Sequence, residues 1–243
     1  MVRKAVVLAA GKSTRIAAVG GGLPKPLLEV GRKPVLARNL RWLADAGIRE
    51  AWVNLHYRPE AIVHRIRDGR GLGLQVRYKR EPTILGTAGG VRAIASGWTE
   101  TFVVLYGDNL VRTSLERMWQ EHQAAAAPIT IGLFDQQRHP HSGIAGGTVT
   151  VDASGRVTAF NEGVGGQSSS LVNAGLYLLE PEVVAMIPAA TSHDFGRDLF
   201  PRLLASGVPI NGHVIDGYCL GLDTPEAYWR ALRLIEQGMV QLK

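Results

Sequence analysis

The chain has 243 residues, 46% of them hydrophobic and 20% charged, with a formal net charge of +6. This length and balance are typical of one globular α/β domain with a sizeable core, or of two small ones. No apolar run approaches the roughly 18 residues that a membrane-spanning helix needs, and the first residues lack the pattern of a secretory leader. We therefore expect no secretion and no membrane partner.

The positive charge does not by itself indicate nucleic acid. Lysine and arginine are scattered along the chain, neither gathered into a run nor interleaved with aromatic residues. A small anionic substrate would explain part of the excess positive charge. The single cysteine, Cys219, cannot form an internal disulfide, which fits a reducing cytoplasm, and we expect it to be a small buried apolar residue.

The first chemical pattern lies between Val6 and Leu28. An apolar run, Ala5 to Ala10, predicts a buried parallel strand. It breaks into a turn with the composition of a phosphate-binding loop, formed by Gly11, Lys12, Ser13, Thr14 and Arg15. Glycine lets backbone N–H groups face an anion, the hydroxyls donate further bonds, and an arginine fork fits phosphate oxygens.

Lys25 follows ten residues later, between Pro24 and Pro26. Because prolines fix φ and disfavour helix in the preceding residue, we expect an extended segment that directs this lysine at one point. The spacing is that of neither a P-loop nor a dinucleotide-binding GxGxxG motif. The pattern therefore needs a different interpretation.

The next elements alternate between helix and strand. Helices are predicted over 34–46 and 59–67, and strands over 51–55 and 74–79. A glycine-rich segment then opens a helix through Ala95, where free N–H groups favour an acceptor. This order is typical of a doubly wound parallel sheet.

A continuous apolar strand, Thr101 to Tyr106, ends in Gly107-Asp108-Asn109. A carboxylate at the end of a central strand is costly to bury unless a positive group pairs with it. Mg²⁺ accepts a few hard oxygen ligands supplemented by water and phosphate. A divalent metal such as Mg²⁺ is therefore a natural partner for this carboxylate.

The second half continues with a helix over 114–123, a strand over 129–134, a hairpin of 149–152 with 156–160, and an amphipathic helix over 194–205. His139 and His141 flank a proline and predict a polar loop rather than a metal site. We expect the last helix, which begins near Thr224, to pack on the core through Trp229, Leu232 and Ile235.

The segments LAAGKSTR, LPKPLLEVGRKPVL and LYGDNL together resemble the signature of sugar nucleotidyltransferases, which join a nucleoside triphosphate to a sugar 1-phosphate. The resemblance implies a single catalytic domain over 1–243. It implies a doubly wound, mostly parallel α/β sheet (Rossmann-like, GT-A type) with a small β insertion over the sugar site. Relatives that also transfer acetyl groups carry an added β-helix, which we do not expect here.

The resemblance also implies residue roles. Nucleotide contacts fall on Leu8, Ala10, Gly11, Lys12, Ser13, Thr14, Gly86, Thr87 and Gly90. Arg15, Lys25 and Asp108 are the implied catalytic residues, with Mg²⁺ on Asp108. Sugar and sugar-phosphate contacts fall on Asn109, Gly143, Glu162 and Asn173.

The sequence departs from the family pattern at two points. Where Glu-Lys-Pro is usual, this chain has Glu162-Gly163-Val164, so the acceptor phosphate must be held otherwise or less tightly. A flexible loop is expected over 165–170. Asp223 stands where the family usually has glycine. It is a second metal ligand in one reading and the N-cap of the last helix in the other.

Three functions remain open. The NLHYRPEAI segment, the HSGI-to-VNAGLYLLEP run and the absence of an appended domain favour a short guanylyltransferase of mannose or heptose phosphates. The two departures favour a cytidylyl- or uridylyltransferase with another phosphorylated acceptor, or a nucleotide-binding module without catalysis. The base, the sugar and the oligomeric state, a homo-oligomer included, stay open.

Overall fold

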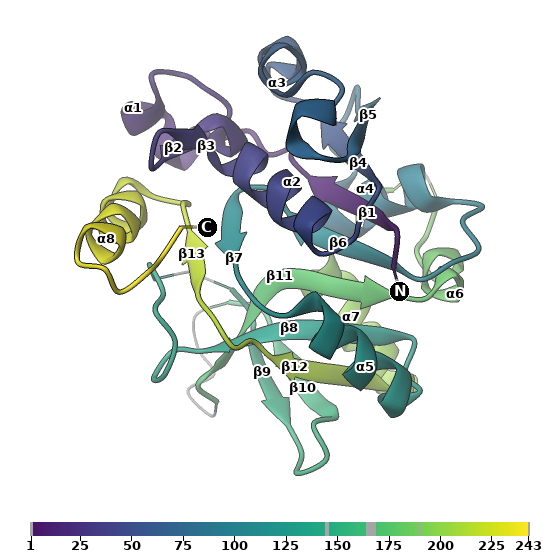
Figure 1. Ribbon diagram of the computed structural model, residues 1–243. Helices are drawn as coiled ribbons and strands as arrows, with labels where there is room; N and C mark the ends of the chain where they lie inside the picture. The colour runs from purple at the N-terminus through teal and green to yellow at the C-terminus, as the bar shows by residue number, and fades with distance from the viewer. Residues whose placement is uncertain (1, 144–145, 164–168, 190, 243) are drawn as a thin grey trace.

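The computed structural model describes residues 2–143, 146–163, 169–189 and 191–242 (Figure 1). The strands are β1 (Lys4–Leu8), β2 (Glu29–Val30), β3 (Lys33–Pro34), β4 (Glu50–Leu55), β5 (Gln75–Arg80), β6 (Phe102–Tyr106), β7 (Asn109–Val111), β8 (Ile129–Asp135), β9 (Thr148–Val151), β10 (Val157–Asn161), β11 (Leu171–Leu179), β12 (Ile210–Val214) and β13 (Cys219–Gly221).

The α-helices are α1 (Ala17–Gly20), α2 (Val35–Asp45), α3 (Pro59–Ile66), α4 (Gly86–Ala95), α5 (Leu115–Ala125), α6 (Pro181–Ala185), α7 (Phe200–Ala205) and α8 (Pro225–Glu236). Short 3-10 turns are η1 (Thr14–Ile16), η2 (Lys25–Leu27) and η3 (Arg70–Leu72), and η4 (Phe195–Leu199) is a π-helical segment. None of the helices in the described part of the chain has the length and apolarity needed to cross a bilayer.

The central sheet has the order β10-β9-β11-β6-β1-β4-β5, and β8 and β12 extend it from β11. The pairs β6-β1, β1-β4 and β4-β5 are parallel, as the alternation of strands and helices predicted. Strand β11 runs antiparallel to β6 and β8. The predicted hairpin is present as β9 and β10, and it joins this sheet at β11 instead of forming a separate layer.

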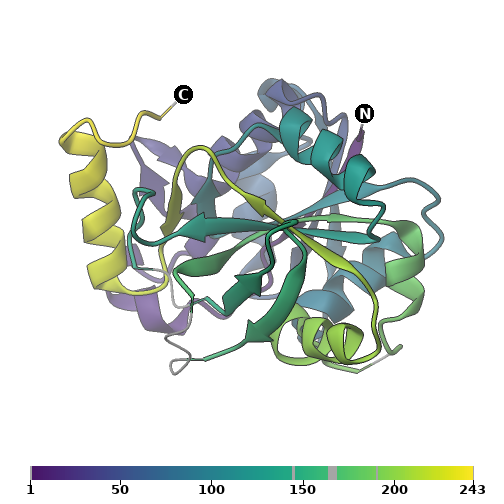
Figure 2. The same cartoon turned by 90° about the horizontal axis from the view of Figure 1, so that it is seen from below.

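Helices cover both faces of the sheet. Side chains of α2, α3 and α5 pack on one face and those of α4, α6 and α7 on the other, in two large apolar clusters. Seen from below, α8 stands at one end of the molecule, beside the chain of β13 (Figure 2). A doubly wound α/β fold is therefore confirmed.

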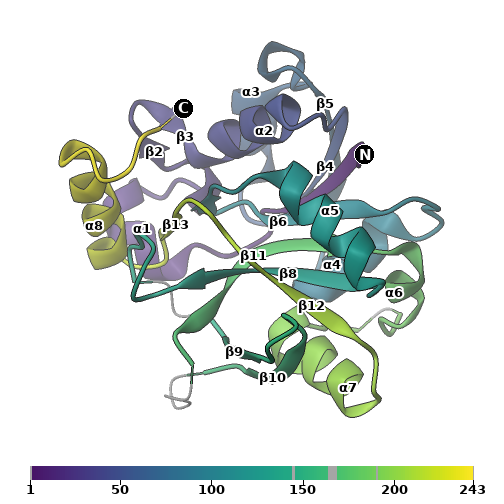
Figure 3. The same cartoon turned by 60° about the horizontal axis from the view of Figure 1, so that its bottom comes forward.

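A third cluster lies at that end (Figure 3). It joins α8 to the small β7-β13 sheet and to the segment around β2 and β3. Leu232 and Ile235 pack against it, as expected. The expectation for Trp229 was wrong: half of this residue is exposed, and its ring meets Tyr228 edge-on.

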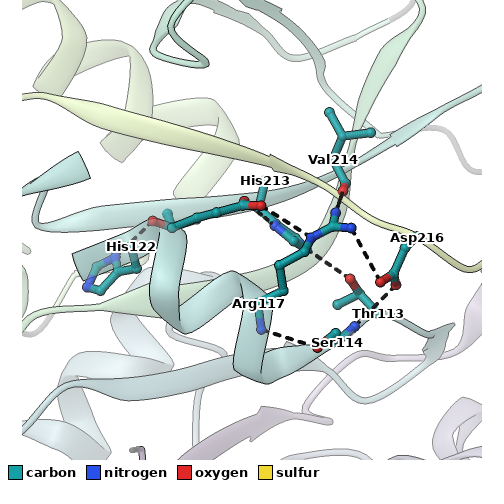
Figure 4. A network of polar contacts seen from close by, with 9 residues as sticks. Thr113, Ser114, Arg117, His122, His213, Val214 and Asp216 are labelled. Carbon is teal, nitrogen blue, oxygen red and sulfur yellow. Dashed lines mark hydrogen bonds and ion pairs between the residues drawn. The ribbon is translucent and has the colours of Figure 1, made fainter. Parts of the chain in front are cut away.

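Two segments differ from the sequence-based expectation. Strand β12 was not predicted; it pairs parallel with β8 and is held to α5 by buried His213 and exposed Arg117 (Figure 4). The predicted helix over 194–205 begins as the π-helical η4 before α7. The loop expected over 165–170 lies outside the described residues apart from its last two.

Candidate active site

A cavity of about 400 Å³ opens at the carboxyl ends of β1, β4 and β6. The predicted site residues that line it are Leu8, Ala10, Gly11, Lys12, Ser13, Thr14, Arg15, Lys25, Gly86, Thr87, Asp108, Asn109, Glu162, Asn173 and Asp223. Ligands of open α/β sheets bind at this edge. Residues predicted to contact the nucleotide, the metal and the sugar thus line the same cavity.

The glycine turn after β1 is tied to the lysine segment. Ser13 has a positive φ of 57°, in the left-handed region, and its Oγ accepts a hydrogen bond of 2.7 Å from the N–H of Lys25. Both residues are buried. Because this bond joins positions twelve residues apart, the turn and the lysine form one unit.

Lys25 lies in η2, so the expected extended conformation is wrong. The N–H of Leu27 donates to the carbonyl of Pro24, which closes a 3-10 turn. The side chain nevertheless points into the cavity. Its Nζ lies 2.7 Å from Asp108 Oδ2 and also contacts Asp223 Oδ1.

The two carboxylates control the charge on Lys25. Burial would lower the pKa of this ammonium, but Asp108 and Asp223 outweigh burial and hold the pKa above its usual value. Arg15 extends the cluster from the solvent side, with its guanidinium 3.7 Å from Asp223 Oδ1. Two acidic side chains therefore face one buried cation and one exposed cation.

Asp223 is not the N-cap of α8. That position belongs to Thr224, whose hydroxyl accepts from the N–H of Ala227 at 3.2 Å. Strand β13, which ends two residues before Asp223, pairs with β7, and β7 begins directly after Asp108. This pairing brings the two carboxylates together across the cavity.

The pair of carboxylates fits a magnesium ion. Mg²⁺ binds through one or two carboxylates and completes its coordination with water and phosphate oxygens. The described residues contain no cluster of three or more histidine, cysteine or acidic side chains that could form a metal site made of protein alone. Asp108 and Asp223 would therefore hold the ion together with a bound phosphate.

The start of α4 differs from the prediction of free N–H groups. The N–H groups of Ala88 and Gly89 both donate to the carbonyl of His193, and that of Thr87 donates to Asp194 Oδ1. The chain itself thus satisfies three N–H groups of the helix N-terminus, those of Thr87, Ala88 and Gly89. Gly86 and Thr87 both line the cavity.

Two predicted glycines do not line the cavity. A Cβ on Gly90 would lie 2.7 Å from Asn54 Nδ2 and 2.8 Å from Glu81 Oε1, so this glycine permits helix packing. Gly143 donates its N–H to His141 Nδ1 in an exposed turn. Their predicted ligand contacts therefore have no support in the described cavity lining.

The opposite wall of the cavity carries the residues predicted for the sugar. Asn173 donates to the hydroxyl of Tyr177 at 2.8 Å and accepts from the N–H of Gly175 at 3.0 Å, so its amide is fixed. Partial burial raises the pKa of Glu162, Arg197 opposes this, and Asp194 adds to it. This wall of the cavity is therefore acidic and polar.

Sequence reasoning missed other lining residues. Asn54 and Tyr106 lie at strand ends within apolar runs, where one polar side chain is a weak signal. Burial raises the pKa of Tyr106 to about 12, so its hydroxyl stays protonated. Asp194, on the segment before η4, had no local motif that could have identified it.

Comparisons with known proteins agree with this geometry. Residues 4–238 match the family model described as nucleotidyl transferase. The chain is 34% identical to a UTP--glucose-1-phosphate uridylyltransferase of Synechocystis, over 95% of this chain and 62% of that protein. It is 33% identical to the mannose-1-phosphate guanylyltransferase of Mycobacterium tuberculosis, over 97% of this chain and 65% of that protein. The chain thus spans less than two thirds of the length of these curated relatives.

Solved structures share the fold. HddC from Yersinia pseudotuberculosis has a TM-score of 0.79 at 22% identity, covering 96% of this chain and 100% of that one. A putative glucose-1-phosphate thymidylyltransferase from Bacillus anthracis has a TM-score of 0.81 at 20% identity, covering 96% and 95%. Since the family model covers almost the whole sequence, the chain belongs to the nucleotidyl transferase family.

Proposed function

We propose that this chain transfers a nucleotidyl group from a nucleoside triphosphate, GTP first, to a mannose- or heptose-type sugar 1-phosphate, and releases pyrophosphate. The observation that carries the proposal is the convergence of the glycine turn, Lys25, Asp108 and Asp223 on one cavity. We propose that residues 1–243 act as one catalytic domain in the cytoplasm.

The reaction is an in-line displacement at the α-phosphorus. A phosphate oxygen of the acceptor attacks, the bond to the β-phosphate oxygen breaks, and pyrophosphate leaves. The attacking phosphate is already largely ionised near neutral pH, so the site needs no general base. The site must instead position two polyanions and offset their repulsion.

Each side chain has a separate task in this scheme. Arg15 and the amides of 11–14 bind the β- and γ-phosphates. Lys25 turns from its carboxylates to the charge that develops at the α-phosphate. Asp108 and Asp223 would hold a magnesium ion, which as a Lewis acid would supply charge stabilisation.

The proposed preference for GTP rests on the similarity of this chain to two known proteins. The guanylyltransferase relative covers nearly the whole chain, and one structural neighbour, HddC, was solved with GMP-PN at a TM-score of 0.78 and 22% identity. The uridylyltransferase relative is equally similar and keeps uridylyl transfer as the second candidate. The residue pair Asp223-Thr224 and the absence of lysine after Glu162 support that alternative, or a cytidylyltransferase.

A matrix assay tests the proposal. Pyrophosphate release is measured with Mg²⁺ for each common nucleoside triphosphate against several sugar 1-phosphates. We expect the highest rate with GTP and a mannose or heptose 1-phosphate, and none with EDTA. A melting-temperature screen of the same ligands runs in parallel, because a ligand that binds only the folded state raises its stability. Thermal shifts without any pyrophosphate release would support a non-catalytic binding module instead.

A further inference from the structure

Asn54 is a buried polar side chain without a role in the scheme above. It is the next-to-last residue of β4, is 2% exposed, and lies between two fully buried apolar residues, Val53 and Leu55. It also lines the nucleotide side of the cavity. A buried amide in an apolar strand costs free energy unless both its ends are hydrogen-bonded.

Both ends of this amide are paired across the cavity wall. The N–H of Ala9 donates to Asn54 Oδ1 at 2.7 Å, and Asn54 Nδ2 donates to Glu81 Oε1 at 2.8 Å. A backbone N–H can only donate, and a carboxylate oxygen accepts, so the partners fix the orientation of the amide. Ala9 is the first residue after β1, where the chain leaves the sheet toward the glycine turn.

Glu81 continues the connection to the opposite side. Its carboxylate is buried, at 4% exposure, and its Oε2 accepts from the N–H of Leu85 at 3.1 Å. Leu85 is the residue before Gly86, with which α4 begins and which lines the cavity. The chain of contacts therefore runs from the entry of the phosphate-binding turn to the entry of α4.

Helix α4 closes over these contacts. Any side chain larger than hydrogen at Gly90 would overlap Asn54 Nδ2 and Glu81 Oε1. The helix backbone thus presses on the amide and the carboxylate and excludes water from them. A hydrogen-bonded pair that is dry and tightly packed holds its distances better than an exposed one.

We infer that Asn54 is a positioning residue that sets the separation between the phosphate-binding turn and the 81–86 segment, and through it the affinity and base preference for the nucleotide. The inference rests on the proposed function, because it assigns Asn54 to the nucleotide half of that site. It touches none of the reacting groups. The acceptor wall, with Glu162 and Asn173, is connected by other contacts.

The test exchanges the amide at position 54 and the carboxylate at position 81. Asn54→Asp keeps the acceptor for the N–H of Ala9 but sets a carboxylate against Glu81, so the two walls repel. The double variant Asn54→Asp with Glu81→Gln restores every bond, because the new amide can donate to position 54 and accept from Leu85. Binding of GTP and of UTP is measured by calorimetry, and the KM for the sugar 1-phosphate separately.

We expect Asn54→Asp to raise the dissociation constant of the preferred triphosphate by about tenfold. The dissociation constants for GTP and UTP should also become more similar to each other. The double variant regains both values to within about threefold. The KM for the sugar 1-phosphate stays within about twofold, because the side-chain bonds of this pair go to Ala9 and Leu85 and not to Glu162 or Asn173. Asn211→Asp is the matched control, since Asn211 is also a buried amide, 8% exposed, on β12 and does not line the cavity.

Three other outcomes overturn the inference in distinguishable ways. Unchanged triphosphate binding by Asn54→Asp, with a lowered melting temperature, shows that the pair serves stability alone. A double variant that folds but does not regain affinity shows that the hydrogen bond between positions 54 and 81 does not set the affinity. If the wild-type protein binds neither triphosphate, the proposed function itself fails, and the inference falls with it.

Discussion

Lys25 is the residue on which most of the proposed chemistry depends, and both its backbone and its side chain make polar contacts. Its backbone N–H holds Ser13 and its ammonium holds Asp108 and Asp223. One side chain therefore connects the phosphate-binding turn to both candidate metal ligands. A divalent cation that binds Asp108 and Asp223 must therefore displace the Lys25 ammonium from both carboxylates.

Lys25→Ala should lower kcat by about 100-fold or more, because it removes a preorganised cation from the developing charge. The melting temperature should change little by comparison, since the fold keeps its three apolar clusters. Steady-state kinetics and thermal unfolding check both values, with Lys33→Ala, an exposed lysine of β3, as control. Turnover within a few-fold of wild type would show that Lys25 has another task.

The same lysine should compete with metal. In the nucleotide-free protein, Lys25→Met leaves two carboxylates that, among the described residues, keep an ion pair only with exposed Arg15, so Mn²⁺ should bind about tenfold tighter than to wild type. Calorimetric titration with Mn²⁺ measures this without any turnover. Asp108→Asn, which removes a ligand, should weaken binding. Equal Mn²⁺ affinity of Lys25→Met and wild type would contradict the competition.

At this scale the sequence predicted residues with a local signal and missed those defined by contacts. Asp108 follows an apolar strand and Lys25 stands between prolines, so both could be found from neighbours in the chain. Asn54 acquires its role from Ala9 and Glu81, 45 and 27 residues away. Gly90 was assigned to a ligand because a packing glycine and a binding glycine have the same sequence pattern.

Among the elements, β12 and α5 are joined by a polar network (Figure 4). His213 is fully buried; its Nδ1 lies 2.5 Å from Glu121 Oε2 and its Nε2 lies 2.9 Å from Thr113 Oγ1. Arg117 adds ion pairs to Glu121 and to Asp216. The unpredicted strand is thus fixed by polar contacts as well as by its ladder.

This network should make stability depend on pH. Burial lowers the pKa of His213 below its ordinary value of 6.5; the Glu121 pair opposes this, Arg117 adds to it, and Asp216 opposes it. Below about pH 6.5 the unfolded chain binds a proton that the folded chain resists, so the free energy of unfolding falls as pH falls. Above that pH the contribution is fully present.

His213→Gln should flatten this dependence, since glutamine does not titrate. Urea unfolding at about pH 7.5 and about pH 5.5 measures the difference for both proteins. The free energy of unfolding of the variant should still fall somewhat as pH falls, because burial also lowers the pKa of His141. An identical slope in the variant would mean that His213 keeps its usual pKa in the folded state.

The elements that the sequence predicted well are long or strongly patterned. Helices α2, α3 and α4 and strands β4, β5 and β6 lie within one or two residues of the predicted bounds. Strands β7 and β13 have three residues each, too few to show a period, and exist because they pair with each other. That pairing places Asp223, which explains why its role stayed open.

At the scale of the whole molecule, the site lies where the central sheet meets the third cluster. Asp108 follows β6 of the central sheet, whereas Asp223 follows β13, which packs in the third cluster with α8. The alternation of elements predicted the sheet, but not that a separate cluster carries one of the two carboxylates. The distance between them therefore depends on the packing of that cluster.

A cavity in the third cluster should accordingly impair metal use. Leu220→Ala, at a fully buried position of β13, should cost about 2–5 kcal/mol of stability and loosen the strand that precedes Asp223. Leu179→Ala, equally buried at the far end of β11, should cost a similar amount within the second cluster. Only the first variant should need a several-fold higher Mg²⁺ concentration for half-maximal rate.

The comparison separates loss of stability from loss of geometry. Both variants are assayed well below their melting temperatures, and Mg²⁺ is titrated at saturating substrates. A raised requirement in both would mean that general loosening, not the third cluster, controls the metal site. A raised requirement in Leu220→Ala alone follows from the structure, because Leu220 pairs with Leu110, two residues after Asp108, and lies three before Asp223.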